Sequence, residues 1–515
     1  MFQAMRFLLI LLIGIVLCAS SSAQVISWGD QGNGTYINPI LNADYSDPDA
    51  IRVGDKYYLV CSEFHFMGMP VLESDDLVNW RIIGNVYDNI DYPEYGRFER
   101  YGSGSWAPAI RYHDGLFYVY FCTPDEGLFM STAKDPSGPW APLHCIKRVK
   151  KWEDPCPFWD EDGNAYLGRS QWGAGPIFIH KMSADGRNLL DDGVIVYTGP
   201  GAEGVKIHKL NNYYYISIPE GGVSRGWQTI LRSKNIYGPY EKKVVLQQGM
   251  TDVNGPHQGA FVDTPNGEWW FIHFQWTQSR GRVAHLQPVL WNNGWPMPGI
   301  DIDRNGIGEP VKVWVKPNTG HSYKIERPAT SDDFNGTVLG LQWHINHKFY
   351  RDHIKLDTKS GYLVLTAMRG DSLRVAPNTL VQKVMGYKGE AIVKLDCHNM
   401  IHGQRAGIVA MTNHFRGIGI EKKERKLYLY TENDGSFKHL DPIKGTTVYF
   451  KLKLNAVDNN NRFYFSTNGK DFHLVGKPFD MHLAFWKGPH IGLFTYNYVT
   501  DGGSALFDWF RYEYD

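Results

Sequence analysis

The side chains of this sequence that are best suited to chemistry are carboxylates, and three of them stand beside proline or glycine. They occur in Ser46-Asp47-Pro48-Asp49, in Glu153-Asp154-Pro155 and in Ala202-Glu203-Gly204. A carboxylate can take a proton from water and a carboxylic acid can give one to a leaving group, so two such groups can perform general acid–base catalysis. The chain has 54 Asp and Glu residues, however, and Asp-Pro pairs also begin turns. A catalytic role therefore depends on a fold that brings these residues together.

An internal repeat indicates a fold of that kind. A turn followed by an aromatic-rich strand occurs five times, at intervals of about 48 to 60 residues, beginning at Gly54, Asp114, Asp162, Asn211 and Asn266. A second phrase follows the strand, beginning at Ser74, Ala133, Ser183, Ser233 and, in altered form, Leu290. A period of about 50 residues with several short strands is typical of β-propeller blades, whose inner strands point at one axis. We expect a five-bladed propeller over residues 24–320; an ordinary sandwich with coincidental hairpins is the alternative.

The chain changes character after a polar, turn-rich segment at residues 316–320, which we interpret as a linker. Beyond it, strands are expected at residues 361–365, 447–452 and 462–465, and Asn468-Gly469 favours a hairpin turn. These features predict a β-sandwich over residues 325–515. The fold class is therefore predicted to be all-β.

The N-terminus has the pattern of a signal peptide, predicted over residues 1–23. An apolar run from Phe7 to Cys18 is too short to span a bilayer, and small residues follow it up to a cleavage site after Ala23. Cys18 could instead be a lipoprotein cysteine, but the bulky Leu17 argues against this. We expect an exported protein, periplasmic or secreted, with no membrane span.

Composition narrows the class of protein further. The formal net charge is -1 and no basic block is present, which argues against nucleic-acid binding. Aromatic residues make up 14% of the chain, which suits both β-sheet packing and stacking on sugars. The five cysteines beyond the signal segment form no CxxC pair and no disulfide framework, and we expect buried thiols.

The order of the motifs resembles glycoside hydrolase family 43. The resemblance is carried by residues 38–41, 45–49, 105–109, 153–155, 202–204 and 281–289. In the second half, Asp333-Phe334-Asn335-Gly336 and the final Phe507-Asp508-Trp509 resemble the concanavalin-like sandwich attached to many members. That family has a five-bladed propeller, in agreement with the repeat.

The resemblance implies an inverting hydrolysis of a glycosidic bond by carboxylates. Asp47 matches the general base that activates water, and Glu203 matches the general acid that protonates the leaving oxygen. Asp154 matches the third carboxylate, which modulates the pKa of the acid and orients it. The base and acid of an inverting enzyme lie about 6.5 to 9.5 Å apart. Asp49 is a minor rival for the base, because this chain has a second acidic residue where the family often has serine.

Further residues are assigned to substrate binding by the same resemblance. Trp106 and Phe64 match aromatic positions near the sugar pocket, and Arg282 matches a residue that reaches the sugar or the carboxylates. His257 matches a histidine near the propeller axis that can lie beside a water-coordinated calcium. Judged by residue type alone, Trp106 could simply pack a blade and His257 could be a hydrogen-bonded core histidine. No cofactor is required for the chemistry, and a structural calcium is allowed.

The resemblance favours an exo-acting enzyme that releases α-L-arabinofuranosyl units from non-reducing ends in plant hemicellulose. Arabinoxylan, arabinan and decorated xyloglucan are the candidate substrates. A β-D-xylosidase or a bifunctional enzyme is the close alternative, and a carbohydrate-binding protein without turnover is the alternative of another class. The sequence makes no prediction about oligomeric state. The sandwich is expected to narrow the pocket as a lid, and an independent sugar-binding module is the alternative.

Overall fold

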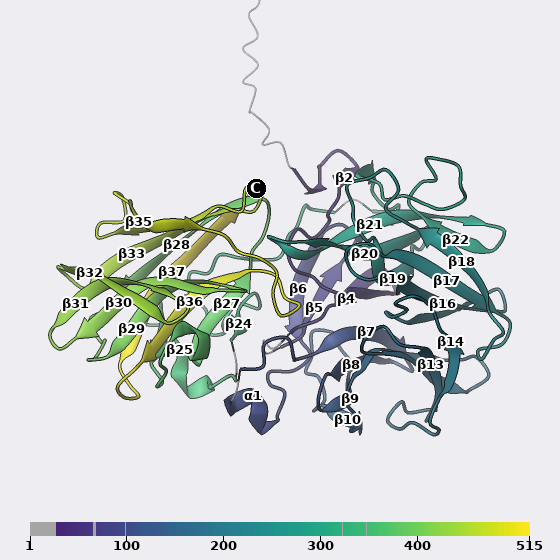
Figure 1. Cartoon of the computed structure of the whole chain (residues 1–515), viewed down its shortest axis with the longest axis horizontal. Coiled ribbons are helices and arrows are strands. Elements are labelled where there is room, and N and C mark those ends of the chain that lie inside the picture. Colours follow the sequence, from purple (N-terminus) through teal and green to yellow (C-terminus); the bar gives the residue numbers. More distant parts are fainter. Residues whose placement is uncertain (1–26, 65–67, 98, 322, 347) are drawn as a thin grey trace, which may run out of the picture.

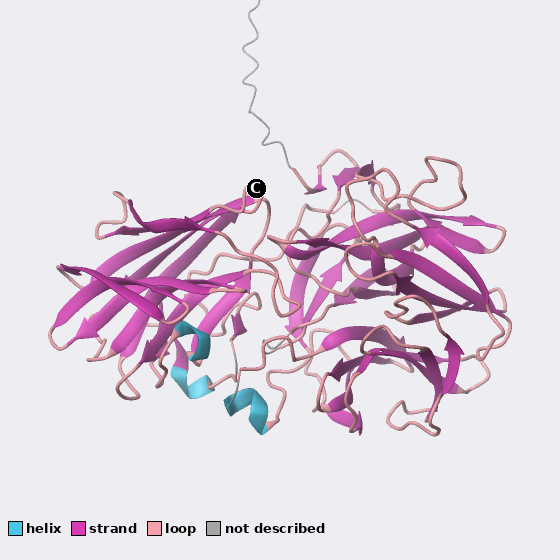
Figure 2. Ribbon diagram, viewed as in Figure 1, coloured by secondary structure: helices cyan, strands magenta, loops and turns pink. Residues whose placement is uncertain are grey.

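The computed structural model describes residues 27–64, 68–97, 99–321, 323–346 and 348–515, and nearly all of its regular structure is strand (Figure 2). Within these ranges the helical elements are α1 (Pro93–Arg97), η1 (Arg351–His353) and η2 (Leu373–Val375). None of the helices in the described part is long and apolar enough to cross a membrane. The predicted signal segment lies outside the described residues.

Five antiparallel sheets of four strands each surround a common axis in the first part of the chain, which confirms the predicted five-bladed propeller (Figure 1). Each blade takes its strands consecutively from the sequence. The blades comprise β3 (Asp49–Val53), β4 (Lys56–Val60), β5 (Pro70–Ser74) and β6 (Trp80–Asn85); β7 (Trp106–His113), β8 (Leu116–Thr123), β9 (Gly127–Ala133) and β10 (His144–Lys147); β11 (Trp152–Trp159), β12 (Ala165–Gln171), β13 (Ile177–Met182) and β14 (Val194–Tyr197); β15 (Lys206–Leu210), β16 (Tyr213–Glu220), β17 (Trp227–Ser233) and β18 (Glu241–Leu246); β19 (His257–Asp263), β20 (Trp269–Thr277), β21 (Gly281–Asn292) and β22 (Trp295–Pro298).

The recurring aromatic phrase forms the second strand of every blade, and the second phrase forms the turn before the fourth strand. Side chains of the second strands pack between neighbouring blades. Tyr58 of β4 and Phe117 of β8, for example, meet edge to face with ring centroids 5.1 Å apart. Burying one such ring stabilises the fold by about 1.5–3 kcal/mol. The aromatic content therefore serves blade packing, and the five cysteines are free thiols.

The chain before the first blade and the chain after the last blade meet in one small sheet outside the five blades. β1 (Gly29–Asp30) and β2 (Thr35–Ile37) form a sheet with β23 (Val313–Val315). Lys316 follows β23, and its Nζ lies 2.5 Å from Asp30 Oδ2 and 2.6 Å from Asp76 Oδ2. The segment that the sequence suggests as a linker thus begins with a residue anchored in the propeller.

Two antiparallel sheets of seven strands form the second part of the chain, as predicted for the sandwich (Figure 1). Their facing sides bury alternate residues, such as Phe450, Leu452 and Val448 of one strand, which are fully enclosed. In spatial order the strands are β24 (His344–Ile345), β27 (Asn378–Lys383), β36 (His490–Asn497), β29 (Gln404–Met411), β30 (Phe415–Lys423), β31 (Lys426–Asn433) and β32 (Ser436–Ile443) in one sheet, and β25 (Ile354–Asp357), β26 (Tyr362–Thr366), β37 (Ser504–Tyr514), β28 (Lys388–Asp396), β33 (Thr447–Asn455), β34 (Asn461–Ser466) and β35 (His473–Phe479) in the other.

Candidate active site

The first strand of each blade lies innermost, so the same ends of these strands meet at one mouth of the central channel. β3 contacts β7, β7 contacts β11, β11 contacts β15, and β19 contacts β3. The N-terminal ends of the first strands, together with nearby loops, enclose a pocket of about 270 Å³. The pocket brings together six of the seven site residues predicted from the sequence, namely Asp47, Phe64, Trp106, Asp154, Glu203 and Arg282.

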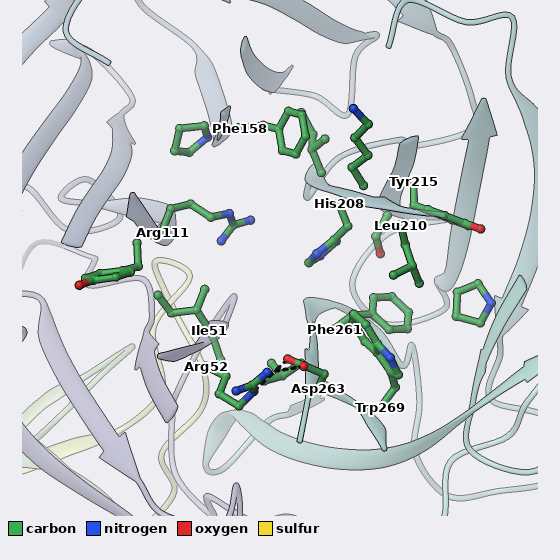
Figure 3. Close-up of a pocket in the computed structure, with 18 of the residues that line it drawn as sticks. Ile51, Arg52, Arg111, Phe158, His208, Leu210, Tyr215, Phe261, Asp263 and Trp269 are labelled. Atoms are coloured by element: carbon green, nitrogen blue, oxygen red, sulfur yellow. Dashed lines mark hydrogen bonds and ion pairs between the residues drawn. The ribbon is translucent and has the colours of Figure 1, made fainter. Parts of the chain in front are cut away.

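A second cavity, of about 320 Å³, lies at the C-terminal ends of the same strands (Figure 3). Arg111 and His208 extend toward it from opposite sides, among aromatic residues such as Phe158 and Phe261. Among the described residues that line it, Asp263 is the sole carboxylate, and it is paired with Arg52 at 2.5 Å. This cavity therefore lacks two carboxyl groups that could divide acid and base roles.

In each blade the backbone turns into the left-handed region at one equivalent position near the start of the first strand, beside the pocket. The residues with positive φ are Asp47 (52°), Ala107 (38°), Asp154 (56°), Gly204 (61°) and Gln258 (54°). In the second, third and fifth blades this residue lies at a β-bulge, which re-aims a side chain away from its normal alternation. A non-glycine residue in this region costs about 1–3 kcal/mol and is commonly found at functional sites.

Asp47 is a buried carboxylate that is held at both oxygens. Its Oδ2 accepts a hydrogen bond from the Ser62 hydroxyl at 2.6 Å, and its Oδ1 lies 2.7 Å from Arg282 Nη1. The rival Asp49 accepts a backbone hydrogen bond from Ile110 and pairs with Arg111 at 2.6 Å, outside the pocket. The geometry therefore favours Asp47 as the carboxylate that a water molecule in the pocket would meet.

Asp154 is fixed by neighbours from two other strands. Its Oδ1 accepts a hydrogen bond from the Gln258 amide at 2.9 Å, and its Oδ2 accepts one from the Ser170 hydroxyl. Burial and then the charge of Glu203 raise the pKa of Asp154 to about 6. The carboxylate thus interacts electrostatically with Glu203, as a residue that tunes and orients the acid must.

Glu153 is a fourth carboxyl in the pocket, and sequence reasoning missed it. Its carboxyl lies with those of Asp154 and Glu203 in a group whose oxygens are within 4.8 Å of one another. Burial, followed by the charges of Asp154, Glu203 and Asp47, raises the pKa of Glu153 to about 9. The sequence does carry a signal, because two acidic residues stand in succession before Pro155.

Glu203 and His257 lie next to each other near the channel axis. The Glu203 side chain is 21% exposed, and its Oε1 lies 3.9 Å from His257 Nε2. His257 Nδ1 lies 2.6 Å from the carbonyl oxygen of Gly255, so Nδ1 carries a proton and donates a hydrogen bond to it, and Nε2 is the ring nitrogen nearer to Glu203. His257 is fully buried and does not line the pocket itself. Among the described residues, the group with metal-ligand spacing is the three carboxylates, without His257.

Aromatic residues form the wall and the mouth of the pocket. Phe64 and Trp106 meet edge to face at 6.4 Å, and Trp172 meets Trp106 at 5.9 Å. Trp172 and Trp486 are the exposed ones, at 48% and 45%. Trp486 comes from the sandwich, so the second domain contributes to the pocket. Sequence reasoning missed both, because their partners lie far away in the chain.

Comparison with known proteins agrees with this geometry. Residues 36–296 match the family described as glycosyl hydrolases family 43. The chain belongs to glycoside hydrolase family 43. Residues 331–513 match the family described as the beta xylosidase C-terminal concanavalin A-like domain. The protein is therefore a glycosidase of hemicellulose degradation, and enzymes of family 43 need no cofactor for catalysis.

Relatives of this family 43 chain are named after different substrates. A protein of Xylanibacter ruminicola named "Putative beta-xylosidase" is 53% identical over 91% of this chain and 88% of its own length. A non-reducing end alpha-L-arabinofuranosidase of Bacteroides ovatus is 30% identical over 82% of this chain and 80% of its own. The crystal structure of a family 43 protein of Bacillus licheniformis, 28% identical, has a TM-score of 0.81 and covers 93% of this chain and 99% of that one.

Proposed function

We propose that the protein is an exo-acting, inverting β-D-xylosidase that removes xylose from the non-reducing ends of oligosaccharides derived from plant xylan. The observation that carries this choice is the 53% identity, across both domains, to the Xylanibacter protein. The sequence alone favoured α-L-arabinofuranose, and that preference is unconfirmed. An α-L-arabinofuranosidase is the second candidate, supported by the 30% identity to the Bacteroides ovatus enzyme.

In the proposed reaction the carboxyl groups of Asp47 and Glu203 act on opposite faces of the sugar. Asp47, oriented by Ser62 and Arg282, takes a proton from a water molecule as its oxygen attacks the anomeric carbon. Glu203 gives its proton to the glycosidic oxygen as the bond from that oxygen to the anomeric carbon breaks. Asp154 remains beside Glu203 and keeps it oriented. The sugar is released with inverted configuration, and no covalent glycosyl-enzyme forms.

The shape of the pocket supports an exo mode of action. Its floor is formed where the first strands converge, and Asp47, Asp154 and Arg282 are buried there. At the mouth, Trp486 of the sandwich stands as an additional wall. A pocket with a buried floor and an added wall at its mouth favours the end of a sugar chain over its middle. Apolar faces of the sugar rings would stack on the aromatic side chains, as other apolar surfaces do.

The test is hydrolysis of an aryl β-D-xyloside and an aryl α-L-arabinofuranoside by the wild type and by Glu203→Gln. We expect a higher kcat/KM on the xyloside and a loss of at least about 100-fold in the variant. Glu161→Gln is the control, because the Glu161 side chain is 88% exposed. A higher kcat/KM on the arabinofuranoside would select the second candidate. No turnover of either would contradict both. Proton NMR of the first-formed sugar should show the inverted anomer.

We also propose that the protein is exported after removal of residues 1–23, and that any calcium near His257 is structural. Export is supported by the sequence of the first residues. N-terminal sequencing of the mature protein from its native host should begin at Gln24. Calcium is supported only by the buried Nε2 of His257, which makes no hydrogen bond within the described residues and would accept one from a water of the ion. The carboxylates supply the acid and base groups without it.

A further inference from the structure

Trp486 is presented to the pocket on a strained turn of the sandwich. The turn lies between β35 and β36, and its ends are joined by hydrogen bonds from the N–H of Ala484 to the carbonyl of Lys487 and the reverse, at 3.0 and 2.9 Å. Phe485 and Trp486 form its tip with φ of 52° and 65°. Two-residue turns with two positive φ values normally carry Asn and Gly, so bulky aromatic residues here need support from their surroundings.

Propeller residues support the turn at its C-terminal end. The Lys487 ammonium pairs with the Glu63 carboxylate, and both side chains are buried. The N–H of Gly488, the next residue, donates to Asp44 Oδ2 at 2.9 Å, while Asp44 Oδ1 accepts from the N–H of Arg282. The turn is therefore attached to two propeller segments that also carry pocket residues.

Glu63 is the centre of a buried cluster that joins the two domains. It is fully enclosed, and besides Lys487 it meets Lys383 Nζ at 3.3 Å and His344 Nδ1 at 3.4 Å, all from the sandwich. Burial alone would raise the pKa of this carboxyl, but Lys383, Lys487 and His344 hold it well below its usual range. A buried carboxylate without partners would be very unfavourable here, so the cluster favours one relative position of the two domains.

The backbone of Glu63 links this cluster to the aromatic wall of the pocket. Its N–H and carbonyl form a bridge with Ser105, at 3.0 and 3.1 Å, and Ser105 immediately precedes Trp106. Phe64 follows Glu63 directly in the chain. Glu63 is thus joined to Ser105 by hydrogen bonds and to Lys487 by an ion pair. Each of these three residues is next in the chain to an aromatic residue of the pocket, namely Phe64, Trp106 and Trp486.

We propose that Glu63 and Lys487 are positioning residues, whose ion pair sets the sandwich turn so that Trp486 contacts the leaving group of the substrate. Trp486 stands at the exposed mouth, where the leaving sugar of an exo-acting enzyme lies, whereas the buried carboxyls lie at the floor. The inference rests on the proposed function for the identity of that leaving group, which is a xylosyl unit. The pair acts on binding of this unit rather than on the chemistry at Asp47 and Glu203.

The test compares Lys487→Met with Lys383→Met. Both remove one cation from the same carboxylate, but Lys383 is in β27 and not on the turn, so it is a matched control for stability. With xylobiose, Lys487→Met should raise KM about 3- to 10-fold over the control, in keeping with one aromatic contact, and change kcat little. With β-D-xylosyl fluoride, whose leaving group is too small to reach the mouth, the KM values of the two variants should agree. Equal KM values on xylobiose would overturn the inference.

A second arm shows whether Lys487 acts through Trp486. If it does, the double variant Trp486→Ala with Lys487→Met should have the same KM for xylobiose as Trp486→Ala alone. Additive effects would refute the connection. Lys487→Arg should restore a KM close to that of the wild type, because it keeps the charge.

Hydrogen exchange of the wild type tests whether the turn that carries Trp486 is held in place. This measurement applies even if Lys487→Met fails to fold or if the wild type cleaves neither substrate. Amides of residues 484–488 should exchange as slowly as those of β36. Rapid exchange there would mean that the turn is not held, and the inference would fall. Failure of both pentosides to react would instead contradict the proposed function, whatever the exchange shows.

Discussion

Replacing Glu153 by glutamine should stabilise the protein, and increasingly so as the pH rises. Burial and the neighbouring charges of Asp154, Glu203 and Asp47 raise the pKa of Glu153 to about 9, against an ordinary value of 4.5. Between these two values the folded chain binds a proton that the unfolded chain does not. Stability is therefore lost as the pH rises through this range, and glutamine removes the loss because it keeps the shape without ionising.

The expected size of the effect follows from the distance of the pH from 4.5. At pH 7 the free energy of unfolding should increase by up to about 3 kcal/mol, and at pH 5 by less than about 1 kcal/mol. Glu153 is 8% exposed, so water screens it little. For a chain of this size the entropy of unfolding is about 1 kcal/mol per kelvin or somewhat less. The gain in unfolding free energy at pH 7 therefore corresponds to a rise of about 3 to 5 °C in Tm.

The assay is the Tm of the wild type, Glu153→Gln and Glu161→Gln at pH 5, 7 and 8. The exposed Glu161 provides the control for loss of a charge, and its variant should follow the wild type. A Tm difference between Glu153→Gln and wild type that stays constant from pH 5 to 8 would refute the reasoning. The same variant should still hydrolyse an aryl xyloside, which separates Glu153 from Glu203 as the source of the catalytic proton.

Three further outcomes are expected. Asp154→Asn should lower kcat by about tenfold or more with less change in KM, because the amide removes the charge beside Glu203; steady-state kinetics checks this, and an unchanged kcat would contradict the tuning role. Chelation by EDTA should leave kcat unchanged, since a carboxylate activates the water; a loss that calcium restores would show otherwise. Tm should fall as the pH drops below about 4.5, because the pKa of Glu63 is held well below that value and its protonation favours the unfolded chain. Glu63→Gln should have a lower Tm at pH 7 and a smaller change between pH 5 and 3, and an equal slope would argue against the buried pairing.

The propeller was predictable because its signal is local and repeated. Each copy of the aromatic phrase is one hairpin strand, and the turn residues before it, such as Gly54 with φ of 62°, mark the start. The carboxylates of the site could be chosen only through the resemblance, since nothing in Asp47-Pro48 by itself distinguishes a base from a turn. Once chosen, they were found together in one pocket.

What the sequence could not predict depends on contacts between distant segments. Glu63 and Lys487 are 424 residues apart, and neither stands in a pattern that indicates burial. The same is true of Trp486, whose position in the pocket depends on the docking of the sandwich on the propeller. Glu153 was missed for another reason, because its unusual protonation arises from burial near three other carboxyls and not from its own residue type.

The left-handed residues around the pocket show how a symmetric scaffold holds an asymmetric reaction. The backbone repeats one conformation in every blade, yet the side chains placed there are two aspartates, one glutamine, one alanine and one glycine. Chemistry has therefore diverged at equivalent points of a pseudo-fivefold ring while the geometry of the main chain stayed the same. Ala107 and Gly204 are the members of the ring without a functional group, and the backbone of Ala107 already has the left-handed conformation that Asp47 and Asp154 use. A new polar group could enter the ring there by substitution alone, so reaction type and fold can evolve separately in this architecture.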